Sequence, residues 1–111
     1  METVRSQQAF SEATELMPGG VSSPARACMS VGSEPVFIRL ASGPHVMDED
    51  GNRYIDLVGA FGPMILGHGH PDVVTALTAQ AVKGLSFGMP TTGETNLARR
   101  IVDTVPSMER V

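Results

Sequence analysis

Residues 45–58 read HVMDEDGNRYIDLV, and this stretch decides the fold of the first half of the chain. Apolar residues flank an acidic run on both sides, as is typical of two strands joined by a turn. Asp50-Gly51 at the centre supplies the positive φ angles that a tight hairpin requires. Residues 36–40, which read VFIRL, have the composition of a further strand. The sequence therefore predicts an antiparallel meander of about three strands.

The acidic run also has the first spacings of a calcium-binding loop. Asp48, Asp50 and Asn52 stand at the first three ligand positions of such a loop. Arg53 replaces the glycine that the loop needs, and Gly59 replaces its bidentate glutamate. The spacing therefore favours a hairpin turn over a metal site.

A helix is predicted before the meander, over residues 3–17. Its apolar residues recur with helical spacing, at Ala9, Ala13, Leu16 and Met17. Pro18-Gly19-Gly20 ends it, because proline cannot continue the hydrogen-bond ladder and glycine accepts a left-handed exit.

Two further helices are predicted after the meander. Residues 71–84 begin with Pro71, which suits the first turn of a helix, and end at Gly84, which is typical of a helix C-terminus. Thr91 and Glu94 have the spacing of a capping box, and the apolar residues after them have helical periodicity.

The composition excludes several classes of protein. A formal net charge of −4 argues against a nucleic-acid binder that relies on a basic surface. No apolar run is long enough to span a membrane. Cys28 is the only cysteine, so neither an intrachain disulfide nor a cysteine-rich zinc site can form. The N-terminal residues lack the apolar segment of a signal peptide, which predicts a cytoplasmic location.

The balance of residue types also predicts an incomplete core. Glycine and proline supply 12 and 8 of the 111 residues, while aromatic residues make up only 5%. A domain of this size should bury about two-thirds of its unfolded surface, which is difficult with so few large side chains. We therefore expect the chain to complete its hydrophobic core against other polypeptide. Residues 21–35 and 59–71 form long aperiodic connections of the kind that is often functional.

Judged by pattern alone, the candidate catalytic and metal-binding residues have structural or surface roles. His68 and His70 could face one metal ion, but a catalytic zinc needs a third protein ligand and no residue has the spacing to provide it. Lys83, the only lysine, falls at the end of a predicted helix, where a cation favours the helix dipole. Cys28 is expected to be a packed or solvent-facing thiol. Spacing alone leaves Arg26 as a surface arginine.

Four longer motifs change the interpretation of Arg26. They are PGGV-x-SP-x-RA at 18–27, D-x-DGNRYID at 48–56, GPMILGH-x-HP at 62–71 and SFG-x-PT at 86–91. Together they resemble the N-terminal quarter of the glutamate-1-semialdehyde 2,1-aminomutases. This family consists of pyridoxal-phosphate (PLP) enzymes of fold-type I in the class III aminotransferase group. The resemblance covers the chain from about residue 10 to residue 111.

The resemblance implies an α/β architecture, the N-terminal segment of a PLP-dependent transferase fold. Residues 1–70 are then part of the small domain, with a helix, a substrate loop and the antiparallel meander. Residues 71–111 are the first helices of the large PLP domain. In that family the glycine-rich loop binds the substrate carboxylate, a role that maps onto Ser23 and Arg26, and Phe61 stands where a tryptophan lines the substrate pocket.

The resemblance also implies an activity, which is carried by the complete enzyme. Members of the family are homodimeric isomerases that convert a small amino-acid aldehyde, glutamate-1-semialdehyde, into 5-aminolevulinate for tetrapyrrole (porphyrin) biosynthesis. Neither nucleic acid nor a membrane is an expected partner. The PLP-binding residues and the Schiff-base lysine of the family lie further along the sequence. We therefore expect no catalytic, cofactor-binding or metal-binding residue here, and no activity from the 111 residues alone.

Two alternatives remain open. Phe61 replaces the tryptophan of the family, and Ser22 replaces an asparagine that is common there. Both departures are compatible with a related class III transaminase that acts on another amino acid. A non-catalytic remnant that serves as an interaction module is the other alternative.

Overall fold

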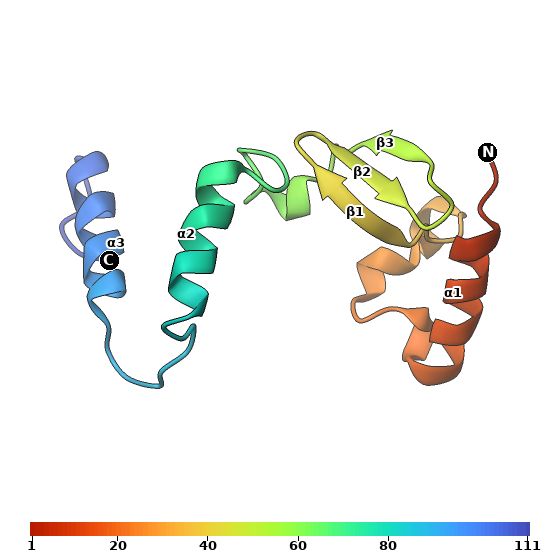
Figure 1. Cartoon of the computed structure of the whole chain (residues 1–111), viewed down its shortest axis with the longest axis horizontal. Helices are drawn as coiled ribbons and strands as arrows, with labels where there is room; N and C mark the ends of the chain where they lie inside the picture. Colours follow the sequence, from red (N-terminus) through yellow and green to blue (C-terminus); the bar gives the residue numbers. More distant parts are fainter. The chain divides into compact units, whose positions relative to one another are not determined.

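The computed structural model describes residues 1–111, which divide into two units, Met1–Thr75 and Ala76–Val111. The longer helices are α1 (Val4–Leu16), α2 (Pro71–Ala81) and α3 (Thr92–Thr104), and the strands are β1 (Ile38–Ser42), β2 (His45–Asp48) and β3 (Arg53–Ile55). Four short 3₁₀ helices complete the set: η1 (Pro18–Gly20), η2 (Pro24–Ala27), η3 (Met29–Val31) and η4 (Gly59–Phe61). Figure 1 shows their order along the chain.

The predicted meander is confirmed. The three strands form one antiparallel sheet in the order β1-β2-β3. Val46 lies opposite Ala41 on one side and opposite Tyr54 on the other. The first strand begins two residues later than predicted, because Phe37 donates its backbone N–H to the hydroxyl of Ser6 at 3.2 Å.

The turn between β2 and β3 joins the sheet to α1, which lies beside that end of the sheet in Figure 1. The Asp50 carboxylate accepts the backbone N–H groups of Arg5 and Ser6, at 2.8 and 2.9 Å. One turn further along α1, the Phe10 ring lies 6.5 Å from the Phe37 ring, measured between centroids. These contacts fix the helix against the segment that leads into β1.

The chain has almost no hydrophobic core of its own. Ala13 and Ala27 are its only buried hydrophobic residues. Leu16, predicted to lie on the apolar face of the first helix, is 76% exposed. Apolar side chains of α2 and α3 are also exposed, at Val73, Val74, Leu77 and Leu97. This exposure agrees with the expectation that other polypeptide completes the core.

Both helices predicted after the meander are confirmed, although the first ends at Ala81 and not at Gly84. At the start of α3 the capping box is complete: Glu94 donates its N–H to Thr91 Oγ1 at 3.4 Å, and Thr91 donates its N–H to Glu94 Oε2 at 3.0 Å. None of the helices combines the length and the apolar character that crossing a membrane requires.

The predicted order of elements, a helix, a small antiparallel sheet and two further helices, is therefore confirmed. The short 3₁₀ helices inside the long connections carry no hydrophobic period, and the sequence did not indicate them. The assignment of residues 1–70 and 71–111 to two domains of a larger enzyme stays a prediction. The units of the structure divide inside α2, between Thr75 and Ala76.

Candidate functional site

Arg26 lies in η2, in the connection between α1 and the sheet. Pro24 begins this short helix, and the carbonyl of Ser23 accepts the Arg26 backbone N–H at 2.9 Å. The guanidinium then extends back along the loop, where its Nη1 donates to the Ser22 hydroxyl at 3.3 Å. The side chains of Ser22 and Arg26 are both exposed. A cation and a hydroxyl are thus held side by side at the surface.

Ser22 and Arg26 line a cavity of about 370 Å³. Its walls are otherwise mostly apolar, with contributions from Met17, Val21, Val36, Phe37 and Ile38. Cavities of this size accept small molecules, and a few polar groups among apolar walls are what orients a ligand. A guanidinium presents paired N–H donors that match the two oxygens of a carboxylate. The cavity therefore suits a small ligand with a carboxylate at one end.

The loop that carries Arg26 is fixed against α1 through Gly20. This glycine is buried and has a φ of 68°. A Cβ added to it would lie 2.7 Å from Cε2 of Phe10 and 2.9 Å from Cγ2 of Thr14. Only glycine allows both the left-handed turn and this close approach of the loop to the helix.

The structure separates the three residues that the sequence assigns to the site. Arg26 lines the cavity, whereas Ser23 does not and instead precedes η2 as its N-cap residue. The serine in contact with Arg26 is Ser22, which sequence reasoning treated only as a departure from the family pattern. Ser22 precedes the extended N-cap residue of η2, so no helical spacing in the sequence signals its contact with Arg26. Phe61 lies in η4, 74% exposed, and does not line this cavity.

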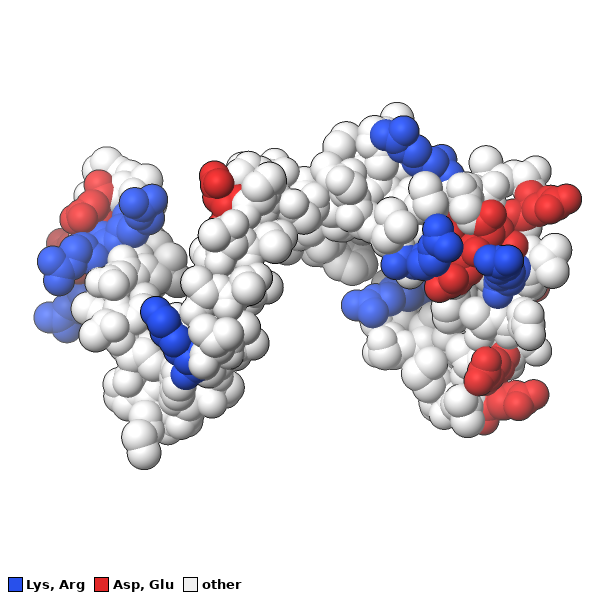
Figure 2. All heavy atoms as spheres, in the orientation of Figure 1, with Lys and Arg blue, Asp and Glu red and all other residues white.

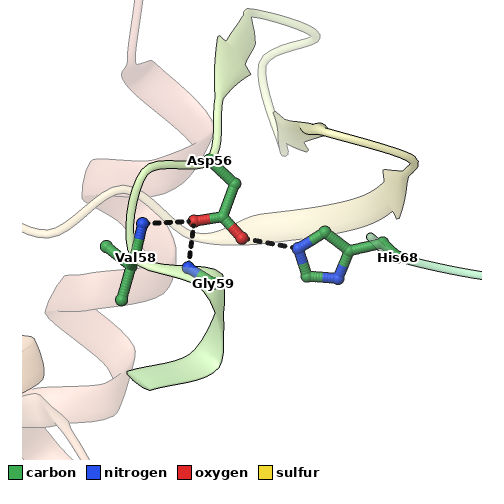
Figure 3. Close-up of polar contacts among 4 residues, drawn as sticks. All are labelled: Asp56, Val58, Gly59 and His68. Atoms are coloured by element: carbon green, nitrogen blue, oxygen red, sulfur yellow. Dashed lines mark hydrogen bonds and ion pairs between the residues drawn. The ribbon is translucent and has the colours of Figure 1, made fainter. Parts of the chain in front are cut away.

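A second cluster of polar groups surrounds Asp56, directly after β3 (Figure 3). One carboxylate oxygen, Oδ1, accepts the backbone N–H groups of Val58 and Gly59 at 2.8 and 3.0 Å. The other, Oδ2, lies 2.6 Å from Nε2 of His68, which donates because an ionised carboxylate can only accept. The His68 hydrogen bond and the two backbone N–H groups hold the pKa of Asp56 below its usual value, against the opposing effect of partial burial.

The Asp48 carboxylate of the acidic turn accepts its hydrogen bonds from within the hairpin. Burial alone would raise the pKa of Asp48, which is fully buried, but hydrogen bonds from Asn52, Tyr54 and the backbone of Asp50 bring it below the usual value. The same hydrogen bond to Asp48 raises the pKa of Tyr54. No group of three or more His, Cys, Asp or Glu side chains in the chain could hold a metal ion. The carboxylate of Asp48 is used within the turn, as the hairpin interpretation requires.

Acidic and basic side chains are interspersed on the face of the first unit that Figure 2 shows. No part of this face is dominated by a broad area of one charge. The positive charge of Arg26 is therefore a local feature, suited to one anionic group of a small ligand.

Comparison with known proteins identifies the family. The pattern of the aminotransferase class-III family matches residues 28–111. The chain belongs to this family. Among curated relatives, the class-III aminotransferase chain is 57% identical over all 111 residues to a glutamate-1-semialdehyde 2,1-aminomutase from Desulforapulum autotrophicum. It is 56% identical over 107 residues, 96% of its length, to one from Rhodopirellula baltica. These matches cover 26% and 24% of the relatives, so the chain spans about a quarter of their length.

Solved structures of a transaminase and of an aminomutase share the fold of this chain. A transaminase with PLP bound superposes with a TM-score of 0.89 at 37% identity, over 98% of this chain and 25% of that one. A glutamate-1-semialdehyde aminomutase from Pseudomonas aeruginosa superposes with a TM-score of 0.78 at 25% identity, over 90% of this chain and 22% of that one. The resemblance found in the sequence motifs is confirmed, and so is the fold class.

The class-III aminotransferase family is PLP-dependent, and one lysine of this chain, Lys83, is the candidate to bind that cofactor. A lysine that bonds covalently to PLP must be desolvated or placed beside another charge to be nucleophilic. Lys83 is exposed, just after the end of α2, and its backbone N–H donates to the carbonyl of Gln80. Lys83 does not fit the role of the Schiff-base lysine. No cofactor-binding residue is assigned within the chain.

Proposed function

We propose that the chain is the N-terminal, substrate-binding part of a glutamate-1-semialdehyde 2,1-aminomutase, an isomerase that forms 5-aminolevulinate for tetrapyrrole biosynthesis. The observation that carries this proposal is the match to five curated relatives of that name, at 50–57% identity over 96–100% of the chain. The cavity beside Arg26 supports it, because the substrate is a small molecule with one carboxylate.

In this proposal Arg26 anchors the substrate carboxylate. The reaction exchanges an amino group between two neighbouring carbons, so the enzyme must present both carbons in turn without releasing the ligand. A bidentate grip on the far end of the molecule permits that movement and maintains orientation. The hydroxyl of Ser22 orients the guanidinium, and Ser23 holds the turn through its backbone. The resemblance to the family assigns Phe61 to the substrate pocket of the complete enzyme, although Phe61 does not line the cavity beside Arg26.

The remaining parts of the proposal concern the complete enzyme. Amino-group transfer requires PLP, which residues outside this chain would hold. Residues 1–70 belong to its small domain and residues 71–111 begin its large PLP domain. The complete enzyme is a cytoplasmic homodimer. Apolar side chains exposed in both units support the presence of such additional polypeptide.

The experiment is a hybrid enzyme in which this chain replaces the matching N-terminal quarter of the Desulforapulum autotrophicum relative. The 57% identity over the whole chain makes the replacement straightforward. We expect the hybrid to bind PLP and to form 5-aminolevulinate from glutamate-1-semialdehyde at a rate similar to that of the relative. A hybrid that folds and binds PLP but forms no 5-aminolevulinate contradicts the proposal and favours the non-catalytic remnant.

A transaminase with another amino-acid substrate is the second candidate. The departures from the family pattern at Phe61 and Ser22 favour it. The same hybrid distinguishes the two candidates. A transaminase releases a keto acid from an added amino acid, whereas an aminomutase converts its single substrate without any second reactant.

A further inference from the structure

The loop that carries Phe61 has an unfavourable backbone conformation. Four consecutive residues, Gly59 to Gly62, have φ angles of 54°, 51°, 65° and 114°. Two of them, Ala60 and Phe61, are not glycine, and a side chain with a Cβ is disfavoured in this left-handed region. Such strain persists only where surrounding contacts hold it, and it is concentrated at functional sites.

Hydrogen bonds within the loop hold its turns, among them the Phe61 N–H to the Val58 carbonyl at 3.0 Å, and one ion pair, Asp56 with His68, joins its two ends. The Asp56 carboxylate accepts the N–H groups of Val58 and Gly59 at the beginning of the loop. Its other oxygen contacts His68 at the end of the loop, 2.6 Å away (Figure 3). One side chain therefore closes the loop from both ends.

The ion pair is itself anchored to the turn between β1 and β2. His68 and Gly43 exchange both of their backbone hydrogen bonds, at 2.8 and 2.9 Å, and Asp56 donates its N–H to Pro44 at 2.9 Å. The approach is close, because a Cβ on Gly67 would lie 2.8 Å from the carbonyl oxygen of Gly43. Asp56 and His68 thus connect the strained loop to the most regular part of the unit.

We propose that Asp56 and His68 are positioning residues, which hold Phe61 in its left-handed conformation and thereby set the affinity for the substrate. This inference rests on the proposed function, in which Phe61 contacts the substrate. A charge-assisted pair is suited to the task because it resists the loop's tendency to relax to ordinary φ angles. Loss of the pair releases the loop, and Phe61 no longer meets the substrate in a fixed position.

The test is a double-mutant cycle in the hybrid enzyme, with Asp56→Asn, Phe61→Ala and the two together. The Michaelis constant for glutamate-1-semialdehyde is measured per PLP bound, so that misfolded protein does not contribute. If Asp56 acts through Phe61, Asp56→Asn alone raises the constant about tenfold and adds little once Phe61→Ala is present. A purely structural pair has no reason to give this dependence. His68→Gln retains an N–H donor to Asp56, so it should raise the Michaelis constant less than Asp56→Asn does.

The controls separate failure of this inference from failure of the proposed function. His45→Gln changes a histidine of β2 that contacts Arg53 at 3.0 Å, and it should leave the constant unchanged. If the effects of Asp56→Asn and Phe61→Ala multiply in the double variant, the positioning role is overturned and the proposed function is not affected. A Phe61→Ala enzyme with an unchanged constant removes Phe61 from the substrate pocket and contradicts that part of the proposed function. If Asp56→Asn does not fold, the same cycle is run with His68→Ala, which removes the donor to Asp56.

Discussion

The carboxylate of Asp50 caps the first turn of α1 from the hairpin turn, by accepting the N–H group of Ser6 at 2.9 Å across 44 residues of sequence. It also accepts the N–H of Arg5 at 2.8 Å. Thr3, the N-cap residue of the helix, makes no such side-chain bond itself. The first N–H groups of a helix have no acceptor within the helix. The hairpin turn of the sheet supplies the acceptor here, through the Asp50 carboxylate. Burial opposes ionisation of Asp50, but these two bonds bring its pKa below the usual value.

The first prediction concerns this cap. Asp50→Asn removes the negative charge at the positive end of the helix dipole and weakens both hydrogen bonds. We expect faster hydrogen exchange at the amides of Arg5 and Ser6 in the hybrid enzyme. Glu49→Gln is the matched control, since the Glu49 side chain in the same turn makes no hydrogen bond to α1, and it should leave exchange at these amides unchanged. Equal effects of the two substitutions would remove Asp50 from the capping role.

The second prediction concerns the contact of the Arg26 loop with α1. Gly20→Ala should destabilise the protein by about 1–3 kcal/mol, because the new methyl group overlaps the Phe10 ring in a conformation that already disfavours a Cβ. Gly19→Ala is the control. Its φ is 70°, but a Cβ there meets nothing within 4 Å, so only the conformational cost remains. Urea denaturation of the two variants measures the difference, and a Gly19→Ala variant as unstable as Gly20→Ala contradicts the packing explanation.

The elements predicted correctly from sequence are those with local signals. Gly51, with a φ of 88°, specifies the hairpin within a few residues, whereas the positive φ predicted for Asp50 is wrong. Thr91 with Glu94 specifies the start of α3 in the same way. Both signals depend on backbone geometry over one turn, so tertiary packing did not alter them. The capping of α1 by Asp50 could not be predicted, because it joins groups 44 residues apart.

The candidate site was predicted only in part, for the same reason. Arg26 was identified by resemblance of its loop, and the structure places it in a cavity. Its contact with Ser22 rather than with the side chain of Ser23 follows from the way η2 turns, which no period in the sequence indicates. The ion pair of Asp56 with His68 depends on how the glycine-rich loop returns to Gly43.

The third prediction concerns the capping box of α3. Thr91→Ala should cost about 1 kcal/mol of local stability, because it leaves the Glu94 N–H without its acceptor. The measurement is hydrogen exchange over the first turn of α3 in the hybrid enzyme. Thr91→Ser keeps the hydroxyl and should restore protection. Protection that is equally low in both variants points to the lost methyl group instead of the lost cap.

The fourth prediction concerns pH. The pKa of Asp56 is lowered from its usual 3.8 in the folded protein. An acid of lowered pKa binds fewer protons folded than unfolded, so its contribution to stability is complete above about pH 4 and declines as pH falls through the folded pKa. We expect amides of residues 58–62 to exchange faster in Asp56→Asn than in the unsubstituted hybrid above about pH 4. As the pH falls below about 4, the ratio of the exchange rates of the two proteins should approach one. A ratio independent of pH contradicts the ionised form as the stabilising one.

The fifth prediction concerns the carboxylate anchor. Arg26→Ala in the hybrid enzyme should raise the Michaelis constant and lower turnover, because the substrate carboxylate loses its paired donors. If the complete enzyme desolvates this pair, the two effects together amount to about 2–5 kcal/mol in transition-state stabilisation. Arg26→Lys keeps the charge without the paired donors and should recover only part of kcat/KM. Arg99→Ala, which removes an exposed arginine of α3, is the control and should leave the kinetics unchanged. Unaltered kinetics in Arg26→Ala would place the anchor elsewhere.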